Sequence, residues 1–242
     1  MSNVLYKGID VSHHNGVIDW QKVKNTEINF VIIRAGYGQN TIDKQFKYNI
    51  ENALKNNIKV GLYWFGYAYN IDMAMREAEF FCNLIEEYKG KIDFPIFYDW
   101  EYDSYNYAVK HCVKPDKQLV TNIVKSFLEV VKRHGWYVGN YTNIDYINRF
   151  FYDEIIKSYD IWLAEWRKNK SRDCHIWQYG AETNYHDSKT VDGIKGIVDK
   201  NYCYVDYPAI IRKKHLNGYK TEKEFTAYDA LKILQKVVGL DE

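Results

Sequence analysis

The chain has 242 residues, 46% of them hydrophobic, which suits one large α/β domain or two small ones. Its 33 basic and 32 acidic residues give a formal net charge of +1, so neither nucleic acid nor an anionic membrane is expected as the main partner. The sequence shows no signal peptide and no apolar stretch long enough to span a membrane.

Short apolar runs alternate with amphipathic segments along most of the chain. Strands are expected within residues 4–12, 28–38, 58–69, 93–102, 136–142, 160–166, 174–180 and 196–204, and helices within 43–57, 72–88 and 115–135. Nearly continuous apolar strands that are separated by helices indicate a parallel sheet covered on its outside. The pattern therefore predicts an α/β fold built as a (β/α) barrel.

The later part of the predicted barrel lacks clear helices. Between Trp162 and Tyr204 there is little helical periodicity, so we expect strands joined by loops or hairpins there. From about residue 209 the sequence becomes basic and polar, and it ends in an amphipathic segment that carries Leu231 and Leu234. This tail is too short to form its own core. We expect a barrel over 1–208 and, over 209–242, a basic linker and helical appendage that packs on the barrel or mediates self-association.

Two acids alternate near the end of the fourth predicted strand. In FPIFYDWEYDS, residues 94–104, Asp99 and Glu101 would share one strand face about 6.6 Å apart, at a rise of ~3.3 Å per residue. Aromatic walls raise the pKa of one such acid while a hydrogen-bonded partner stays ionised, and glycoside hydrolysis uses this kind of pair. The alternative is a set of solvated strand-end acids. Asp103 is assigned to the loop beyond the pair.

Two further acids lie beside predicted strands. Asp10 precedes His13 and His14 at the end of the first strand, and Asp199 lies in the last apolar run. Each acid could instead be an ordinary turn residue that hydrogen-bonds its local backbone.

Motifs for a metal or a cofactor are missing from the sequence. Adjacent histidines point to opposite faces of a strand, and no acid or cysteine is spaced to join them, so no metal site is predicted. The four cysteines lack the spacing of a zinc site or a disulfide framework. Without a nucleotide-binding or nucleophile-elbow motif, no cofactor is expected.

Taken in order, these segments resemble glycoside hydrolase family 25, the Chalaropsis-type lysozymes of phage endolysins and bacterial autolysins. The resemblance runs from about Lys7 to Tyr204 and rests on GIDVSHHNG, FVIIRAGYG, VGLYWFGYA, FYDWEYDS, WLAEW, IWQYG and IVDKN. It implies an irregular barrel of five β/α units followed by strands that lack full helices. It also implies an N-acetylmuramidase that cleaves the β-1,4 bond between N-acetylmuramic acid and N-acetylglucosamine.

The resemblance assigns roles to individual residues. Glu101 matches the general acid/base, and Asp99 matches the acid that orients the acetamido group of the substrate. The supporting or substrate-binding positions are Asp10, Asp199, Tyr63, Tyr141, Gln178 and Trp166. The family retains the anomeric configuration, and we favour attack by the substrate's own 2-acetamido group over a covalent aspartyl intermediate.

Two departures from the family pattern bear on substrate preference. Many members have histidine where this chain has Trp64, and tyrosine where it has Trp166. The first change removes a polar cleft contact. Neither change affects the four acids.

Two alternative functions remain open from the sequence. DWEY ends the signature of family 18 chitinases, D-x-x-D-x-D-x-E, but Phe94 and Phe97 occupy the two earlier aspartate positions. A barrel that binds cell-wall glycan without cutting it is the second alternative, and the presence of all four acids argues against it. The expected partner is bacterial cell-wall peptidoglycan, reached after cytoplasmic synthesis and holin-type release, or through a leader that is absent from this chain.

Overall fold

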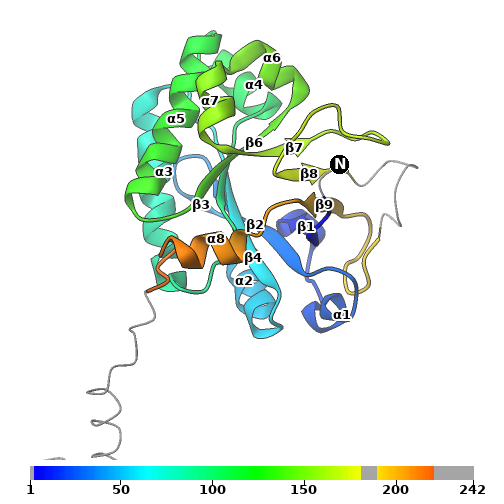
Figure 1. Ribbon diagram of the computed structural model, residues 1–242. Helices are drawn as coiled ribbons and strands as arrows, with labels where there is room; N and C mark the ends of the chain where they lie inside the picture. Colours follow the sequence, from blue (N-terminus) through cyan, green and yellow to red (C-terminus); the bar gives the residue numbers. More distant parts are fainter. Residues whose placement is uncertain (1–2, 181–189, 221–242) are drawn as a thin grey trace, which may run out of the picture.

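The computed structural model describes residues 3–180 and 190–220 (Figure 1). Its strands are β1 (Tyr6–Val11), β2 (Phe30–Tyr37), β3 (Thr41–Ile42), β4 (Lys59–Phe65), β5 (Ile96–Asp99), β6 (Val138–Asn143), β7 (Asp160–Ala164), β8 (Ile176–Gln178) and β9 (Asp199–Cys203). They form one sheet in the order β1-β9-β8-β7-β6-β5-β4-β2-β3, and pairing of β1 with β2 closes eight of them into a barrel. The predicted α/β barrel is confirmed.

Helices cover the outside of the first five strand units. They are α1 (Trp20–Lys24), α2 (Phe46–Lys55), α3 (Ile71–Ile85), α4 (Tyr102–Lys110), α5 (Lys117–Arg133), α6 (Ile144–Phe150) and α7 (Asp153–Ser158). A further helix, α8 (Tyr207–Lys213), follows the last strand. The three long predicted helices are α2, α3 and α5. Within the described residues there is no helix between β7 and β9, and no helix is both long and apolar enough to cross a membrane.

Side chains at the cap positions fix where two of the long helices, α3 and α5, begin. Asp116 precedes α5 and accepts a hydrogen bond from the backbone nitrogen of Leu119 at 2.8 Å. Asn70 does the same for Met73 at the start of α3, at 2.9 Å. These bonds satisfy backbone donors that have no partner inside the helix. Because α3 begins at a fixed point, the loop at the carboxyl end of β4 is short and defined.

The last strand, β9, runs against its two neighbours. It pairs antiparallel with β1 and with β8, whereas the pairings of β1 with β2 and of β4 with β5 are parallel. The first residue of β9, Asp199, therefore lies opposite Asp10 near the end of β1. Reversal of one strand thus brings the start of β9 to the end of the barrel where the parallel strands finish.

Aromatic side chains fill the inside of the barrel. The Phe30 and Phe94 rings stack with centroids 4.5 Å apart, and the Phe97 and Trp162 centroids are 5.2 Å apart. All four side chains are at most 1% exposed. Gly139 leaves room for them, since a Cβ there would lie 2.5 Å from the Phe97 ring. The filled interior confines inward-facing polar residues to the mouth of the barrel.

The segment after β9 closes the opposite, amino-terminal end of the barrel. The boundary expected at residue 208 falls inside α8, and the polar residues beyond it contain the fully buried Asn217. Its amide nitrogen donates to the carbonyls of Ile92 and Phe94, and its amide oxygen accepts from the backbone nitrogen of Tyr137 at 2.7 Å. The helix expected near Leu231 and Leu234 lies outside the described residues.

Replacing Asn217 tests how firmly this segment is attached. Asn217→Ala removes three side-chain hydrogen bonds and leaves buried backbone groups unpaired, so we expect the free energy of unfolding to fall by about 2–4 kcal/mol. Urea unfolding measures this change. Asn83→Ala, on the exposed face of α3, is the matched control and shifts stability by less than about 0.5 kcal/mol. Equal stabilities of the two variants would contradict the role given to Asn217.

Candidate active site

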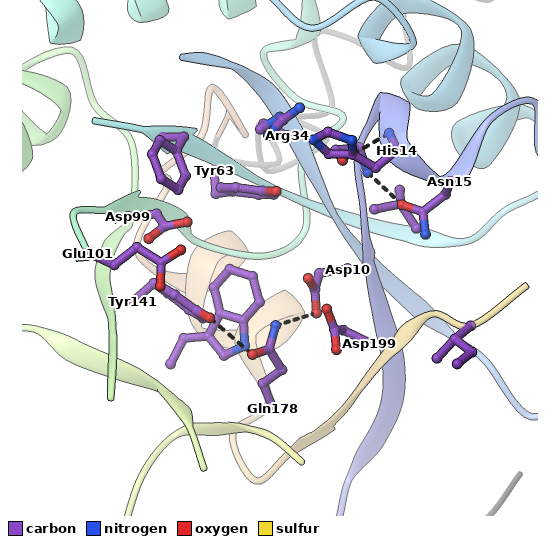
Figure 2. A pocket seen from close by; sticks show the side chains of 15 residues that line it. Asp10, His14, Asn15, Arg34, Tyr63, Asp99, Glu101, Tyr141, Gln178 and Asp199 are labelled. Carbon is purple, nitrogen blue, oxygen red and sulfur yellow. Dashed lines mark hydrogen bonds between the residues drawn. The ribbon is translucent and has the colours of Figure 1, made fainter. Parts of the chain in front are cut away.

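A cavity of 270 Å³ opens at the carboxyl ends of the barrel strands (Figure 2). Seven of the residues singled out from the sequence line it: Asp10, Tyr63, Asp99, Glu101, Tyr141, Gln178 and Asp199. They come from β1, β4, β5, β6, β8 and β9 and the start of α4. Residues far apart in the chain therefore meet in one place, as the parallel strand order requires.

Glu101 occupies a different local position from the one expected. Strand β5 ends at Asp99, so the two acids do not share a strand face; Glu101 instead stands at the N-cap of α4. Its backbone nitrogen donates to the Ser104 hydroxyl at 3.0 Å, and that hydroxyl donates to the carbonyl of Gly66 at 2.6 Å. Both acids still line the cavity. Asp103, which we expected in a loop, lies in the first turn of α4.

Asp99 is the more deeply buried acid of the pair. Its side chain is almost inaccessible, and its Oδ1 atom has no hydrogen-bond partner among the described residues. Burial is the largest cause that raises the pKa of Asp99 well above its usual value, and the charges of Glu101 and Asp10 add to it. The positive charge of Arg34 acts in the opposite direction. Asp99 is thus a buried acceptor that remains available to a bound molecule.

Glu101 is partly buried beside Tyr141 (Figure 2). Burial, followed by repulsion from Asp103 and Asp199, raises the pKa of Glu101 to about 7. A carboxyl group with this pKa holds a proton for much of the time near neutral pH. It can therefore donate that proton and later take one back.

Asp10 is held by a chain of hydrogen bonds across the mouth of the barrel. Its Oδ2 atom accepts from Gln178 at 3.0 Å and from Asn201 at 2.8 Å. Tyr141 donates to the amide oxygen of Gln178 at 3.0 Å, and the Trp162 indole donates to that of Asn201 at 2.7 Å. Burial, and then the charge of Asp199, raise the pKa of Asp10, whereas the two amide bonds lower it. The chain fixes the orientation of the Asp10 carboxyl group.

A second polar cluster beside the cavity was not found from the sequence. Arg34 of β2 donates through Nε to Asp43 Oδ2 at 2.8 Å, and His13 Nδ1 lies 2.8 Å from the same oxygen. Arg34 lines the cavity together with His14. No spacing rule joins His13, Arg34 and Asp43, so the sequence carried no usable signal for this cluster. Within the described residues, no group of three or more His, Cys, Asp or Glu side chains is arranged so that it could hold a metal ion.

Trp166 lies outside the main cavity. It lines an adjoining depression with Tyr102 and Arg167, and this depression shares Glu101 and Tyr141 with the main cavity. The Trp166 side chain is 50% exposed, and its indole nitrogen lies 3.5 Å from the amide oxygen of Gln178. The exposed ring offers a flat apolar surface at the rim of the site.

Stability should depend on pH through Glu101. Its folded pKa of about 7 exceeds the ordinary value of 4.5, so the folded protein binds more protons between these values and its stability falls as pH rises through this window. Glu101→Gln has no such loss. We therefore expect its free energy of unfolding, relative to that of the wild type, to be about 1–3 kcal/mol higher at pH 8 than at pH 4. Urea titrations at both pH values measure the effect. Glu87→Gln, at an exposed site, should show no such difference; equal behaviour of the two variants would refute the raised pKa.

Comparisons with known proteins agree with the fold. Residues 9–193 match the family model described as glycosyl hydrolases family 25. The chain is 26% identical over 200 residues to an autolytic lysozyme of Clostridium acetobutylicum, covering 80% of this chain and 54% of that protein. It is 36% identical over 77 residues to Lysozyme M1 of Streptomyces globisporus, covering 32% of this chain and 26% of that protein. The chain thus spans about half or less of the length of these two relatives.

Two solved structures show the same architecture. A family 25 glycosyl hydrolase from Bacillus anthracis superposes with a TM-score of 0.68 at 27% identity, covering 85% of this chain and 91% of that one. The modular autolysin LytC from Streptococcus pneumoniae gives a TM-score of 0.68 at 28% identity, covering 81% and 46% of the two chains. LytC has also been solved in complex with a synthetic peptidoglycan ligand.

Proposed function

The chain belongs to glycosyl hydrolases family 25, and from that premise we propose that it is a peptidoglycan hydrolase acting on the bacterial cell wall. The bond we propose is the β-1,4 linkage between N-acetylmuramic acid and N-acetylglucosamine, cleaved with retention of configuration. The observation that carries the proposal is the meeting of Asp99 and Glu101, both with raised pKa values, in one cavity at the carboxyl ends of the strands. The autolytic and lysozyme relatives support it.

Glu101 is the proposed general acid and base. With a pKa of about 7 it is protonated at mildly acidic pH and can pass its proton to the glycosidic oxygen as the bond to the anomeric carbon breaks. The resulting carboxylate then removes a proton from the incoming water. One residue serves both steps because its pKa lies close to the working pH.

Asp99 is proposed to hold the acetamido group of the substrate. Its Oδ1 atom is buried and has no partner among the described residues, so it can accept the acetamido N–H. The acetamido oxygen then attacks the anomeric carbon while the leaving oxygen takes the proton of Glu101, which gives a cyclic intermediate that water opens with overall retention. Asp99 must be ionised to stabilise the positive charge that develops on the acetamido nitrogen.

The other polar residues are proposed to shape the groove. Tyr141, Gln178 and Asn201 hold Asp10 in place through the hydrogen bonds described above. Asp199 faces Asp10 across paired strands, and Tyr63 lies on the next wall of the cavity. The exposed ring of Trp166 is suited to stack on a sugar beyond the scissile bond.

The two alternative functions fit the observations less well. The positions of the two earlier aspartates in the chitinase signature are Phe94 and Phe97, which are fully buried inside the barrel and so hold packing side chains. A barrel that only binds glycan has no need of buried carboxyl groups with raised pKa values, because such groups reduce stability near neutral pH. Catalysis gives these groups a use.

Loss of the proton donor should abolish wall hydrolysis. We expect Glu101→Gln to clear a suspension of Gram-positive cell walls about 10³-fold more slowly than the wild type, since general acid catalysis contributes about 10²–10⁴-fold. The matched control is Glu87→Gln, the same substitution at an exposed glutamate outside the cavity, which should change the rate by less than about threefold. Wall clearing by Glu101→Gln at the wild-type rate would refute the assignment, and no clearing by wild type would favour the binding barrel.

The products identify the bond and the part played by Asp99. Mass spectrometry of digested peptidoglycan should find muramic acid at the new reducing ends; glucosamine there would make the enzyme a glucosaminidase instead. Asp99→Asn should lower kcat by about 10²-fold with little change in KM, because the residue acts mainly on the developing charge. A change confined to KM would contradict that role.

A further inference from the structure

Arg34 is the one permanent cation among the described residues that line the cavity. Four acids, namely Asp10, Asp99, Glu101 and Asp199, line the same cavity. His14 also lines the cavity, but burial, followed by the charges of His13 and Arg34, lowers its pKa, so it is mostly neutral at neutral pH. The charge balance of the cavity therefore depends on a single guanidinium group.

The position of Arg34 is fixed from behind by Asp43. The Asp43 side chain is fully buried; its Oδ2 atom accepts a hydrogen bond from Nε of Arg34 at 2.8 Å and lies 2.8 Å from Nη2 in an ion pair. Nη2 also lies 2.6 Å from His13 Nδ1, and the backbone nitrogens of His13 and Gln45 donate to the Asp43 carboxylate. Within the described residues, Nη1 donates no hydrogen bond. The guanidinium is thus held in one orientation, and its Nη1 donor has no partner there.

The proposed chemistry requires a particular distribution of protons. Glu101 must be protonated and Asp99 must be ionised before the bond can break. Asp99, however, is the more deeply buried of the two, so burial alone would leave the proton on Asp99. Some group must favour the ionised form of Asp99, and Arg34 is the nearby charge that does so.

We propose that Arg34, held in one orientation at the wall of the cavity, is a positioning residue that favours the ionised form of Asp99 and so helps to keep the mobile proton of the cleft on Glu101. The inference rests on the function proposed above and deepens it. Asp43 and His13 act one step further away, because both contact Arg34 and the Asp43 carboxylate partly offsets its charge. Arg34 does not touch the reacting atoms; it acts through Asp99.

The surroundings offer no substitute for Arg34 among the described residues. The titratable and charged groups around the pair are Asp10 on β1, Tyr63 on β4, Asp103 on α4, Tyr141 on β6, Asp199 on β9, and His13, His14 and Asp43 beside Arg34. Of these groups, Asp10, Asp103 and Asp199 raise the pKa of Asp99 or Glu101. Removing the guanidinium therefore leaves the ionised form of Asp99 without a positive neighbour.

The test compares Arg34→Gln with Arg34→Lys in the full chain. ¹³C-carboxyl NMR of the substrate-free protein, with the Asp99 signal assigned through Asp99→Asn, measures the titration midpoint of Asp99. We expect Arg34→Gln to raise this midpoint by about one pH unit or more, and Arg34→Lys to shift it by less than half as much. Arg133→Gln, an exposed arginine on α5, is the matched control and leaves the midpoint unchanged.

Activity gives a second, independent readout. In Arg34→Gln, Asp99 should ionise at a higher pH and Glu101 should lose its proton at a lower pH than in the wild type. Both changes narrow the bell-shaped dependence of kcat/KM on pH, and kcat should fall about tenfold. Arg34→Lys restores most of the width. A loss of activity with an unchanged profile would show a merely structural role and overturn the proposal.

A further variant keeps the proposal testable if Arg34→Gln does not fold. Arg34→Met keeps the length and the apolar part of the side chain but removes the positive charge, so it should raise the titration midpoint of Asp99 as Arg34→Gln does. An unchanged midpoint in the folded variants overturns the role of Arg34. Because these titrations need no substrate, they are separable from the wall-clearing test of Glu101, whose failure would refute the proposed function instead.

Discussion

Four carboxyl groups share one small cavity above a barrel packed with aromatic rings, and the rest of the site depends on this constraint. Such closely placed acids in a partly dry cavity cannot all be ionised together. The hydrogen bonds of Gln178 and Asn201 to Asp10, and the guanidinium of Arg34, offset part of this cost. The remaining cost appears as raised pKa values, and the raised pKa of Glu101 supports its proposed role as the proton donor.

The topology brings these groups together. The parallel strands end at the mouth of the barrel, and the reversed strand β9 begins there, so Asp199 and Asn201 enter the site beside Asp10 and Gln178. A parallel β9 would place Asp199 at the opposite end of the barrel. Segment 207–219 then closes the other end through Asn217, which leaves the mouth as the open end of the interior.

Much of the fold could be predicted from the sequence, because continuous apolar strands and three long amphipathic helices have strong periodic patterns. Short helices such as α6 and α7 span too few turns to show one. The position of Glu101 was predicted wrongly at the local level, since strand β5 is ended by contacts of Trp100 and Ser104 with the loop after β4, which are distant in sequence. The contact between Arg34 and Asp43 was not predicted, because it depends on the pairing of β2 with β3.

The account makes Glu101 the acid whose proton is available near neutral pH. The most direct measurement is a ¹³C-carboxyl NMR titration of the wild-type protein, with the Glu101 signal assigned by its absence in Glu101→Gln. We predict a midpoint of about 7 for Glu101. A midpoint at the ordinary value of about 4.5 would contradict the account, because Glu101 would then be ionised at neutral pH and could not act as the general acid.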